Sequence, residues 1–218
     1  MRAQTEDVFG LERPMDVIPN FVDTERFRPE RDRGIRHCFS KHDERVVMHV
    51  SNFRPVKWAE LAVRALARAA VATLVMVGDG PDRGACERLA QKRGIKDRVR
   101  FLGAQTDVQH LLPAADLFLL PSEYESFGLA ALEAMACGVV PVVTKAGGLP
   151  ELIRDGEDGV LVPDSEMDRM GSLAASLLAD ETRMARMSAA AREAAEGRFG
   201  REGIVGRYEA VYRGVLTP

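Results

Sequence analysis

Two glutamates flank a short segment whose backbone could bind an anion. Glu125 lies in a polar turn after the apolar run 117–120, and Glu133 is the only charged residue of the apolar segment that follows. The stretch 121–138 passes through that turn into small, helix-forming residues and ends on a glycine. This pattern predicts a strand, a tight loop and a buried helix. A carboxylate on such a helix needs hydrogen-bond donors, because burying it unpaired is costly.

The first amides of this helix form a candidate site for phosphate. The first four N–H groups of a helix lack partners within it, and the helix dipole favours negative charge there. Carboxylates only accept hydrogen bonds, so the flanking glutamates favour hydroxyl groups on either side of the anion. A diphosphate that joins two hydroxyl-bearing rings, as in a sugar nucleotide, meets both demands. The amides belong to Ser126, Phe127, Gly128 and Leu129.

The residues alone leave a plainer interpretation open. A strand, a loop and a helix with two glutamates are common in α/β proteins. Glu125 would then be a solvated loop residue, and Glu133 would reach water at the helix edge. Arg54 and Lys57, which follow the end of another predicted strand, would be solvated surface cations. On the alternative interpretation, this guanidinium and this ammonium bind the oxygens of a diphosphate.

The composition is typical of a globular protein in a reducing compartment. The 218 residues are 46% hydrophobic and 29% charged, with a formal net charge of −3. That charge predicts no nucleic-acid partner, and no apolar run is long enough for stable membrane insertion. The three cysteines are widely spaced and form no CxxC pair, which indicates free thiols rather than disulfides or zinc ligands. We therefore expect a cytoplasmic protein.

Apolar runs alternate with helical segments from residue 45 to residue 163, and the chain beyond is helical. This alternation predicts an α/β fold, a Rossmann-like doubly wound parallel sheet followed by C-terminal helices. Ligands of such sheets bind beyond the carboxyl ends of the strands. The predicted strands are 46–51, 73–77, 99–102, 117–120, 139–143 and 160–162, and the predicted helices include 58–70, one ending near 94, one that Asp164 caps, 181–196 and 204–216.

The N-terminal region carries weaker signals. Residues 1–15 are polar and irregular, and 16–20 predict a short strand and a turn. From there to about Lys41 the sequence is rich in charge and proline, which indicates a linker or loop.

Five short motifs are specific enough to identify a family. Glu125, seven residues and Glu133 stand within 121–138, and GGLPE follows at 147–151. The others are VIPNFVD at 17–23, SNFRPVK at 51–57 and GDGP at 78–81. Together they resemble the retaining GT-B glycosyltransferases of family 4. Within that family, SNFRPVK and YESFGLAALEAMACG are most similar to the bacillithiol-pathway enzymes that transfer N-acetylglucosamine to L-malate.

The resemblance implies a division into domains. Residues 16–218 would be the C-terminal half of a GT-B fold, which binds the nucleotide-sugar donor, and residues 1–15 a linker or a remnant of the preceding domain. The missing N-terminal domain would hold the acceptor, so the isolated half would bind donor weakly and transfer little. The apolar stripe of the last helix would pack on this domain or on another chain, which makes a homo-oligomer possible.

The resemblance also implies roles for the residues of the loop–helix segment. Glu133 would accept hydrogen bonds from the ribose hydroxyls, and Glu125 would hold a hydroxyl of the donor sugar. The diphosphate would bind the amides from Ser126 to Leu129.

Further roles implied by the resemblance fall on three other loops. Lys57 and Arg54 would neutralise the leaving diphosphate, although Asn52 stands where many family members have arginine. The backbone around Val99 and Arg100 would contact the edge of the base. Gly78 and Gly80 would permit close backbone approach near that base, and a plain strand-to-helix turn would also explain them.

The predicted reaction transfers a sugar, GlcNAc by analogy, from a UDP-sugar to a hydroxyl acceptor with retention and without a metal or other cofactor. Two alternatives stay open. A UDP-sugar epimerase of GT-B fold shares the carboxylates and would interconvert epimers without an acceptor. A non-catalytic nucleotide-sugar-binding or assembly module would show itself as a stable dimer. No histidine has metal-ligand spacing, so we expect loop or core positions for His37, His42, His49 and His110.

Overall fold

A parallel sheet forms the centre of the chain. The computed structural model describes residues 6, 8–10, 15–30, 32–40, 44–67 and 72–216. Within these residues the sheet has six strands in the order β3-β2-β1-β4-β5-β6. The strands are β1 (Arg45–Val50), β2 (Ala72–Val77), β3 (Val99–Gly103), β4 (Leu117–Leu120), β5 (Val140–Thr144) and β6 (Val160–Val162). Each lies within one residue of its predicted bounds, and the predicted parallel, doubly wound sheet is confirmed.

The strand order reverses between β1 and β4, and sheets of this kind have a crevice at such a point. These strands are neighbours, with Val47 paired to Leu117, although two other strands separate them in the sequence. The chain winds outward from β1 in one direction and from β4 in the other, so the loops that follow these two strands begin side by side. Ligands of such sheets bind here, beyond the carboxyl ends of the strands.

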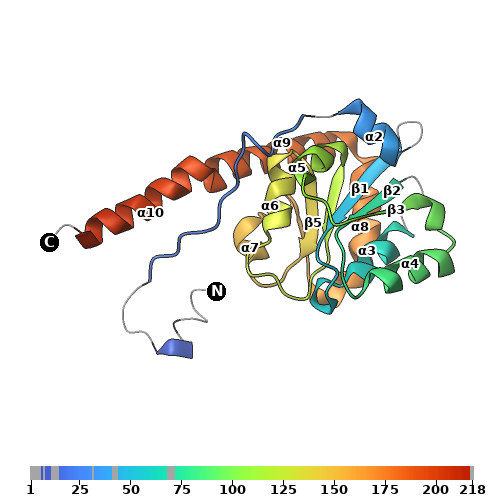
Figure 1. Ribbon diagram of the computed structural model, residues 1–218, viewed down its shortest axis with the longest axis horizontal. Helices are drawn as coiled ribbons and strands as arrows, with labels where there is room; N and C mark the ends of the chain where they lie inside the picture. Colours follow the sequence, from blue (N-terminus) through green and yellow to red (C-terminus); the bar gives the residue numbers. More distant parts are fainter. Residues whose placement is uncertain are drawn as a thin grey trace.

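Helices cover both faces of the sheet (Figure 1). One face carries α3 (Ala59–Leu66), α4 (Arg83–Lys92) and α8 (Met170–Ala179), and the other carries α5 (Val108–Leu111), α6 (Leu129–Ala136) and α7 (Leu149–Leu152). The long helix α9 (Glu181–Phe199) supplies Met187 to the first face and Ala195 to the second. Short 3₁₀ helices complete the connections: η1 (Pro55–Lys57), η2 (Lys96–Arg98), η3 (Leu112–Ala114) and η4 (Asp164–Arg169).

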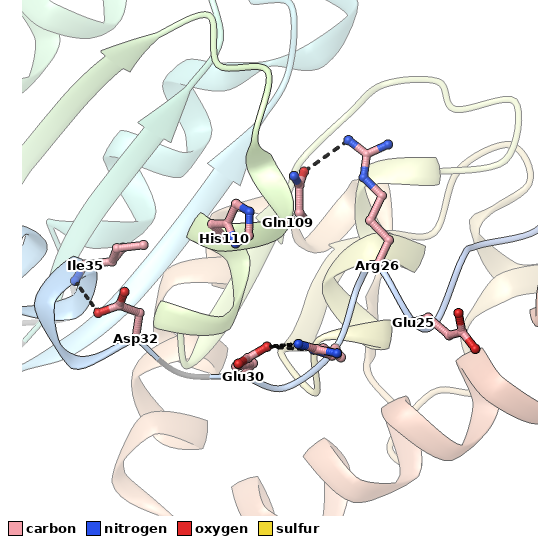
Figure 2. A pocket seen from close by; sticks show the side chains of 8 residues that line it. Glu25, Arg26, Glu30, Asp32, Ile35, Gln109 and His110 are labelled. Atoms are coloured by element: carbon pink, nitrogen blue, oxygen red, sulfur yellow. Dashed lines mark hydrogen bonds and ion pairs between the residues drawn. The ribbon is translucent and has the colours of Figure 1, made fainter.

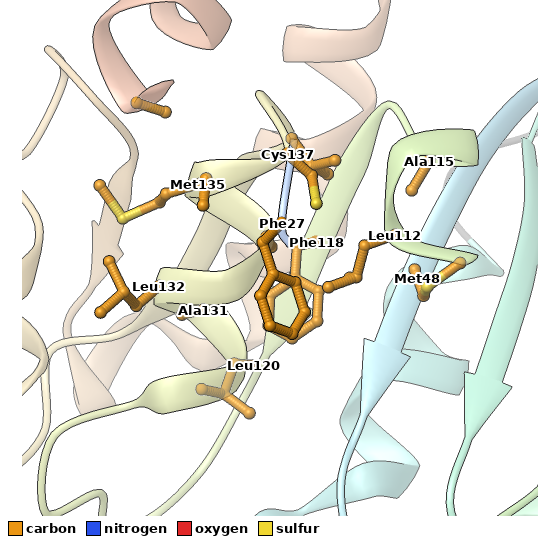
Figure 3. Close-up of a cluster of buried hydrophobic side chains, with 14 of the residues drawn as sticks. Phe27, Met48, Leu112, Ala115, Phe118, Leu120, Ala131, Leu132, Met135 and Cys137 are labelled. Atoms are coloured by element: carbon orange, nitrogen blue, oxygen red, sulfur yellow. The ribbon is translucent and has the colours of Figure 1, made fainter. Parts of the chain in front are cut away.

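Burial on the α6 face explains how the N-terminal segment is held. Phe27 packs with Phe118, Leu112 and the side chains of α6 in one apolar cluster (Figure 3). The Arg192 guanidinium donates to the carbonyl oxygens of Phe27 and Ala136, so α9 ties this segment to the end of α6.

The N-terminal predictions need two corrections. Residues 15–20 form no strand, and only an isolated bridge joins Val22 to Gly200. The predicted linker contains a helix, α2 (Arg33–Phe39). It forms because Asp32 Oδ1 accepts the Gly34 N–H at 2.7 Å and because Phe39 is buried. Most of the predicted remnant at 1–15, the end of the predicted helix 58–70 and His42 lie outside the described residues.

The prediction for Asp164 is also wrong. It is the first residue of η4, and Pro163 stands at the cap position before it. The α-helix begins only at Met170. A 3₁₀ turn after Pro163 therefore connects the sheet to the C-terminal helices.

The final helix, α10 (Arg201–Leu216), leaves the body of the domain (Figure 1). Ile204 is its one buried residue, whereas Tyr212 and Val215 of the predicted apolar stripe are 64% and 79% exposed. The stripe does not fold onto this domain. The extended segment around Val17 runs beside the helix, and the Arg207 guanidinium donates to the Val17 carbonyl oxygen at 2.7 Å. In the described part of the chain no helix has the length and apolar character needed to cross a membrane.

A buried histidine stands at the centre of the sheet, as a core position predicts. His49 of β1 is fully buried, and its Nδ1 lies 2.9 Å from the Leu119 carbonyl oxygen. A carbonyl only accepts, so Nδ1 carries the proton and Nε2 accepts from Ser51 Oγ at 2.8 Å. Ser51 Oγ in turn accepts the Phe53 N–H at 3.2 Å. The neutral imidazole therefore supports the loop that follows β1.

This histidine makes the stability of the fold depend on pH. Burial lowers the pKa of His49 to about 4, opposed by the Leu119 carbonyl and assisted by the Lys57 charge. Between about pH 4 and pH 6.5 this histidine binds a proton in the unfolded chain but not in the folded one. The contribution of neutral His49 to the unfolding free energy is therefore complete above pH 6.5 and is lost as the pH falls. We expect the wild-type chain to lose about 2 kcal/mol more unfolding free energy than His49→Gln between pH 7.5 and pH 5, since one pKa unit is worth about 1.4 kcal/mol. Urea titrations at both pH values measure this difference.

His110→Gln is the control, because His110 lies exposed on α5. Its stability should follow the wild-type pH curve. Parallel curves for wild type and His49→Gln would contradict the assignment of a neutral, buried imidazole.

Candidate functional site

The loops after β1 and β4 meet at the crevice through an ion pair. Lys57 Nζ donates to Glu125 Oε1 at 2.5 Å, and Ser122 Oγ donates to the same oxygen at 2.9 Å. The backbone joins the loops as well, since the Glu123 N–H donates to the Val56 carbonyl at 2.8 Å. The structure thus brings together Lys57 and Glu125, which are 68 residues apart in the sequence.

A third loop fixes the backbone of Glu125. The Gly148 N–H donates to the Glu125 carbonyl at 2.8 Å. Gly147 has φ +55°, and a Cβ there would lie 1.9 Å from that same carbonyl oxygen. Thr144, at the end of β5, donates through Oγ1 to the Ser122 carbonyl at 2.5 Å. The two glycines therefore serve to let the loop after β5 pack directly against the loop that carries Glu125.

Glycines support the other loop in the same way. A Cβ on Gly78 would lie 1.7 Å from the Ser51 carbonyl oxygen, and one on Gly80 would lie 2.0 Å from that of Asn52. The close approach predicted at these glycines is thus an approach to the loop after β1. That loop is itself strained, because Phe53 and Trp58 have φ of 45° and 44°.

The beginning of α6 presents free amides. Gly128 precedes the helix with φ +92°, and no side chain caps it. Its carbonyl accepts from Ala131 and Leu132, so the helical hydrogen bonds begin after the predicted anion site. Within the described residues, no backbone carbonyl accepts from the amides of Ser126 to Leu129. The Phe127 ring is buried against Phe199 at a centroid distance of 5.7 Å, which anchors this turn.

Glu133 lies on α6 beyond these amides and is half-buried. Burial raises the pKa of its carboxyl group, and the positive charge of Arg26 opposes that effect. Among the described residues, none donates a hydrogen bond to this carboxylate or forms an ion pair with it. Among the described residues, Glu133 is therefore a partly desolvated acceptor without a partner, and its ribose role stays a prediction.

Sequence reasoning missed Arg26. Its guanidinium donates through Nη2 to Gln109 Oε1 at 3.2 Å, between the N-terminal segment and α5 (Figure 2). Both residues line a cavity of about 620 Å³. The sequence did contain one signal for Arg26. Phe27 is an apolar residue in a charged segment, which predicts that it is buried, and burial of Phe27 fixes the position of its neighbour Arg26. The other lining residues are Glu25, Arg28, Glu30, Asp32, Ile35 and His110.

Two predicted residues of the site lie on the loop after β1 in exposed positions. Arg54 and Asn52 are both exposed. In the described part of the chain, the Arg54 guanidinium has no carboxylate within ion-pair distance. It stands three residues before Lys57 and is accessible to an anion.

The prediction for Val99 and Arg100 is corrected by the direction of β3. Val99 is the first residue of that strand and pairs with Leu74, and the carboxyl end of the strand is Gly103. Four residues at about 3.3 Å each place Val99 roughly 13 Å from the edge where the other loops meet. Arg100 donates instead to the Asp97 carbonyl at 2.9 Å. Gly103 lies at the correct edge, where its carbonyl accepts the Gly78 N–H at 2.8 Å.

The described residues contain no cluster of three or more His, Cys, Asp or Glu side chains suited to a metal ion. The absence of a metal from the reaction stays a prediction.

The contact between Gly147 and Glu125 predicts a large cost for one methyl group. Gly147→Ala should lower the unfolding free energy by about 2 kcal/mol or more, because a Cβ meets backbone and the residue keeps a positive φ. Gly156→Ala is the matched control, since Gly156 has φ +77° and no atom lies within 4 Å of the position that its Cβ would take. It should lose only about 1 kcal/mol. If urea unfolding showed equal losses of unfolding free energy in the two variants, the close contact with the Glu125 carbonyl would not be what excludes a side chain at position 147.

Comparisons with known proteins identify the family of this chain. The family model described as glycosyl transferases group 1 matches residues 32–194. The N-acetyl-alpha-D-glucosaminyl L-malate synthase of Bacillus anthracis is 38% identical over 98% of this chain, which covers 57% of that protein. The D-inositol 3-phosphate glycosyltransferase of Mycobacterium marinum is 36% identical over 75% of this chain, which covers 37% of its length.

A solved structure shows the same arrangement of elements. Anabaena Alr3699/HepE, crystallised in complex with UDP-glucose, has a TM-score of 0.83 and 27% identity; the match covers 91% of this chain and 57% of that one. The chain thus spans 57% of the malate synthase and of HepE, and 37% of the inositol 3-phosphate glycosyltransferase. The family match covers most of its sequence, and the chain belongs to the group 1 glycosyl transferases, with the Rossmann-like fold of GT-B enzymes.

Proposed function

We propose that this chain binds a UDP-sugar and forms the donor half of a retaining glycosyltransferase. The observation that carries the proposal is the meeting of Lys57, Glu125 and the free amides of α6 at one edge of the sheet. A diphosphate at those amides lies beside the Lys57 ammonium, with Arg54 accessible on the same loop. The complex of Anabaena HepE with UDP-glucose supports this class of ligand.

Each carboxylate then takes a hydroxyl-bearing part of the donor. Glu133, half-buried and without a partner among the described residues, accepts from the ribose. Glu125 accepts from a hydroxyl of the transferred sugar. The base lies toward the carboxyl end of β3, near Gly103, rather than near Val99.

Catalysis in this proposal depends on stabilising charge that develops on the leaving diphosphate. Lys57, Arg54 and the α6 amides supply the compensating positive charge, and fixed donors of this kind are among the largest contributions to enzymatic rate. Glu125 is not a glycosidase-type nucleophile, because a retaining hydrolase needs a second carboxylate across the scissile bond and Glu133 serves the ribose. The departing phosphate oxygen accepts the proton of the incoming hydroxyl on the same face of the sugar.

The similarity to the malate synthase supports GlcNAc as the sugar and L-malate as the acceptor, in the cytoplasm. The acceptor half of the enzyme packs against α10 in this proposal, because the stripe that includes Tyr208, Val211 and Tyr212 is exposed. Burying such side chains against a partner is favourable by roughly 25 cal/mol per Å² of apolar surface.

Affinity for UDP tests the donor site. Lys57→Ala and Glu133→Ala should each weaken UDP binding by roughly ten- to a hundredfold, since hydrogen bonds to charged groups are worth about 1.5–3 kcal/mol. Isothermal titration calorimetry measures the Kd. Trp58 provides a second signal, because it is the only tryptophan of the chain and adjoins Lys57.

Lys92→Ala and Glu193→Ala are matched controls on exposed positions of α4 and α9, and both should bind UDP like the wild type. Unchanged affinity in both site variants would refute the donor site. Transfer of GlcNAc to L-malate by an enzyme that contains this chain, and its loss in Lys57→Ala, tests the proposed reaction.

A further inference from the structure

The ion pair of the site joins two residues that the proposed function assigns to different parts of the donor. Lys57 should meet the diphosphate and Glu125 a sugar hydroxyl, but in the structure each side chain binds the other at 2.5 Å. Both are largely withdrawn from water, with side-chain exposures of 20% for Lys57 and 10% for Glu125. Separating the ammonium from the carboxylate therefore costs free energy, because water cannot fully solvate either group in place of its partner.

Glu125 has little freedom to follow Lys57 elsewhere. Ser122 Oγ binds the same carboxylate oxygen, and the Gly147–Gly148 turn packs against the Glu125 backbone. Lys57 is the more mobile partner, because its long side chain extends from the short helix η1. A ligand therefore acts on the pair by drawing the ammonium away from a fixed carboxylate.

UDP and a UDP-sugar differ in what they return to that carboxylate. The diphosphate of either ligand attracts Lys57. Free UDP leaves Glu125 buried with Ser122 as its remaining donor, and a buried charge without its partner is costly. A UDP-sugar brings a hydroxyl that donates to Glu125 and replaces the lost contact.

We propose that Lys57 and Glu125 form an exchange pair, through which the site favours the intact sugar nucleotide over free UDP. This inference rests on the proposed donor site. In it, the donor separates the pair by binding both members, and the pair re-forms after transfer because UDP retains no hydroxyl for Glu125. Re-formation of the pair promotes release of UDP.

The exchange pair predicts that removing a charge from the site improves binding of the product. Glu125→Gln keeps the shape and the contact with Ser122 but no longer holds Lys57 by charge. The Kd for UDP should fall by about three- to tenfold, whereas the Kd for UDP-GlcNAc should not improve, so the preference for the sugar nucleotide diminishes. Calorimetric titrations of wild type and variant with UDP and UDP-GlcNAc measure both constants.

Two further variants sharpen the experiment. Glu125→Asp retains the charge but shortens the side chain by one methylene, and it should give a smaller gain for UDP in the same direction; it also serves if the glutamine variant does not fold. Asp158→Asn removes the carboxylate of a comparably buried ion pair with Arg198, 3.2 Å apart and on another part of the fold. It should leave both affinities unchanged.

The outcomes separate the two proposals. Unchanged or weaker UDP binding in folded Glu125→Gln overturns the exchange pair while Lys57→Ala and Glu133→Ala still weaken UDP binding. If wild type binds no UDP, or those two variants bind it normally, the donor site itself is wrong. A gain for UDP in Asp158→Asn would mean that the effect is general, and would also overturn the exchange pair.

Discussion

The site depends on the reversal of strand order between β1 and β4. Because these strands are adjacent and parallel, the loops that follow them emerge side by side at one edge of the sheet. This topology brings Lys57 and Glu125 together across 68 residues of sequence. The crevice is thus a property of the topology, and side chains on the two loops give it chemical character.

The loops keep this arrangement because backbone packs directly against backbone on both sides of the crevice. Gly78 and Gly80 approach the loop that carries Lys57, while Gly147 and Gly148 approach the loop that carries Glu125. At each of these four positions a Cβ would lie well inside contact distance of a carbonyl oxygen. Side-chain hydrogen bonds from His49 and Thr144 add support from within the sheet. The positions of Lys57 and Glu125 therefore depend on uncharged residues, the four glycines, His49 and Thr144, that have no role in binding the ligand.

Much of the fold was predictable because buried parallel strands are continuous apolar runs. β4 and β6 have their predicted bounds, and the others differ by at most one residue at either end. The misplaced helix α2 depended on one local contact and one buried side chain that the composition of its segment concealed. α2 forms through the Asp32 cap and the burial of Phe39, and both occur in a segment whose charge and proline content indicate a loop.

The candidate site was predictable where a motif and a strand end coincide. Lys57, Glu125 and the amides before α6 satisfy that condition. Val99 and Arg100 do not satisfy it, because they lie at the beginning of β3. The apolar run identifies the strand, but it does not show which end of the strand lies beside the ligand. Arg26 escaped prediction for a different reason: the buried Phe27 marks its segment, but the effect of its charge on Glu133 acts between residues far apart in the sequence.

In the proposed donor site, the distribution of charge would let two carboxylates border an anion without repelling it. Lys57 compensates Glu125, and Arg26 partly compensates Glu133, so each carboxylate has a cation near it. In the proposed function, the α6 amides and Arg54 bind the phosphates together with Lys57, which the donor draws away from Glu125. Because carboxylates accept and cations donate, a ligand matches this pattern only if phosphate oxygens alternate with hydroxyl groups along its length. A sugar nucleotide has that order of groups, whereas a simple polyanion would place oxygens against Glu125 and Glu133.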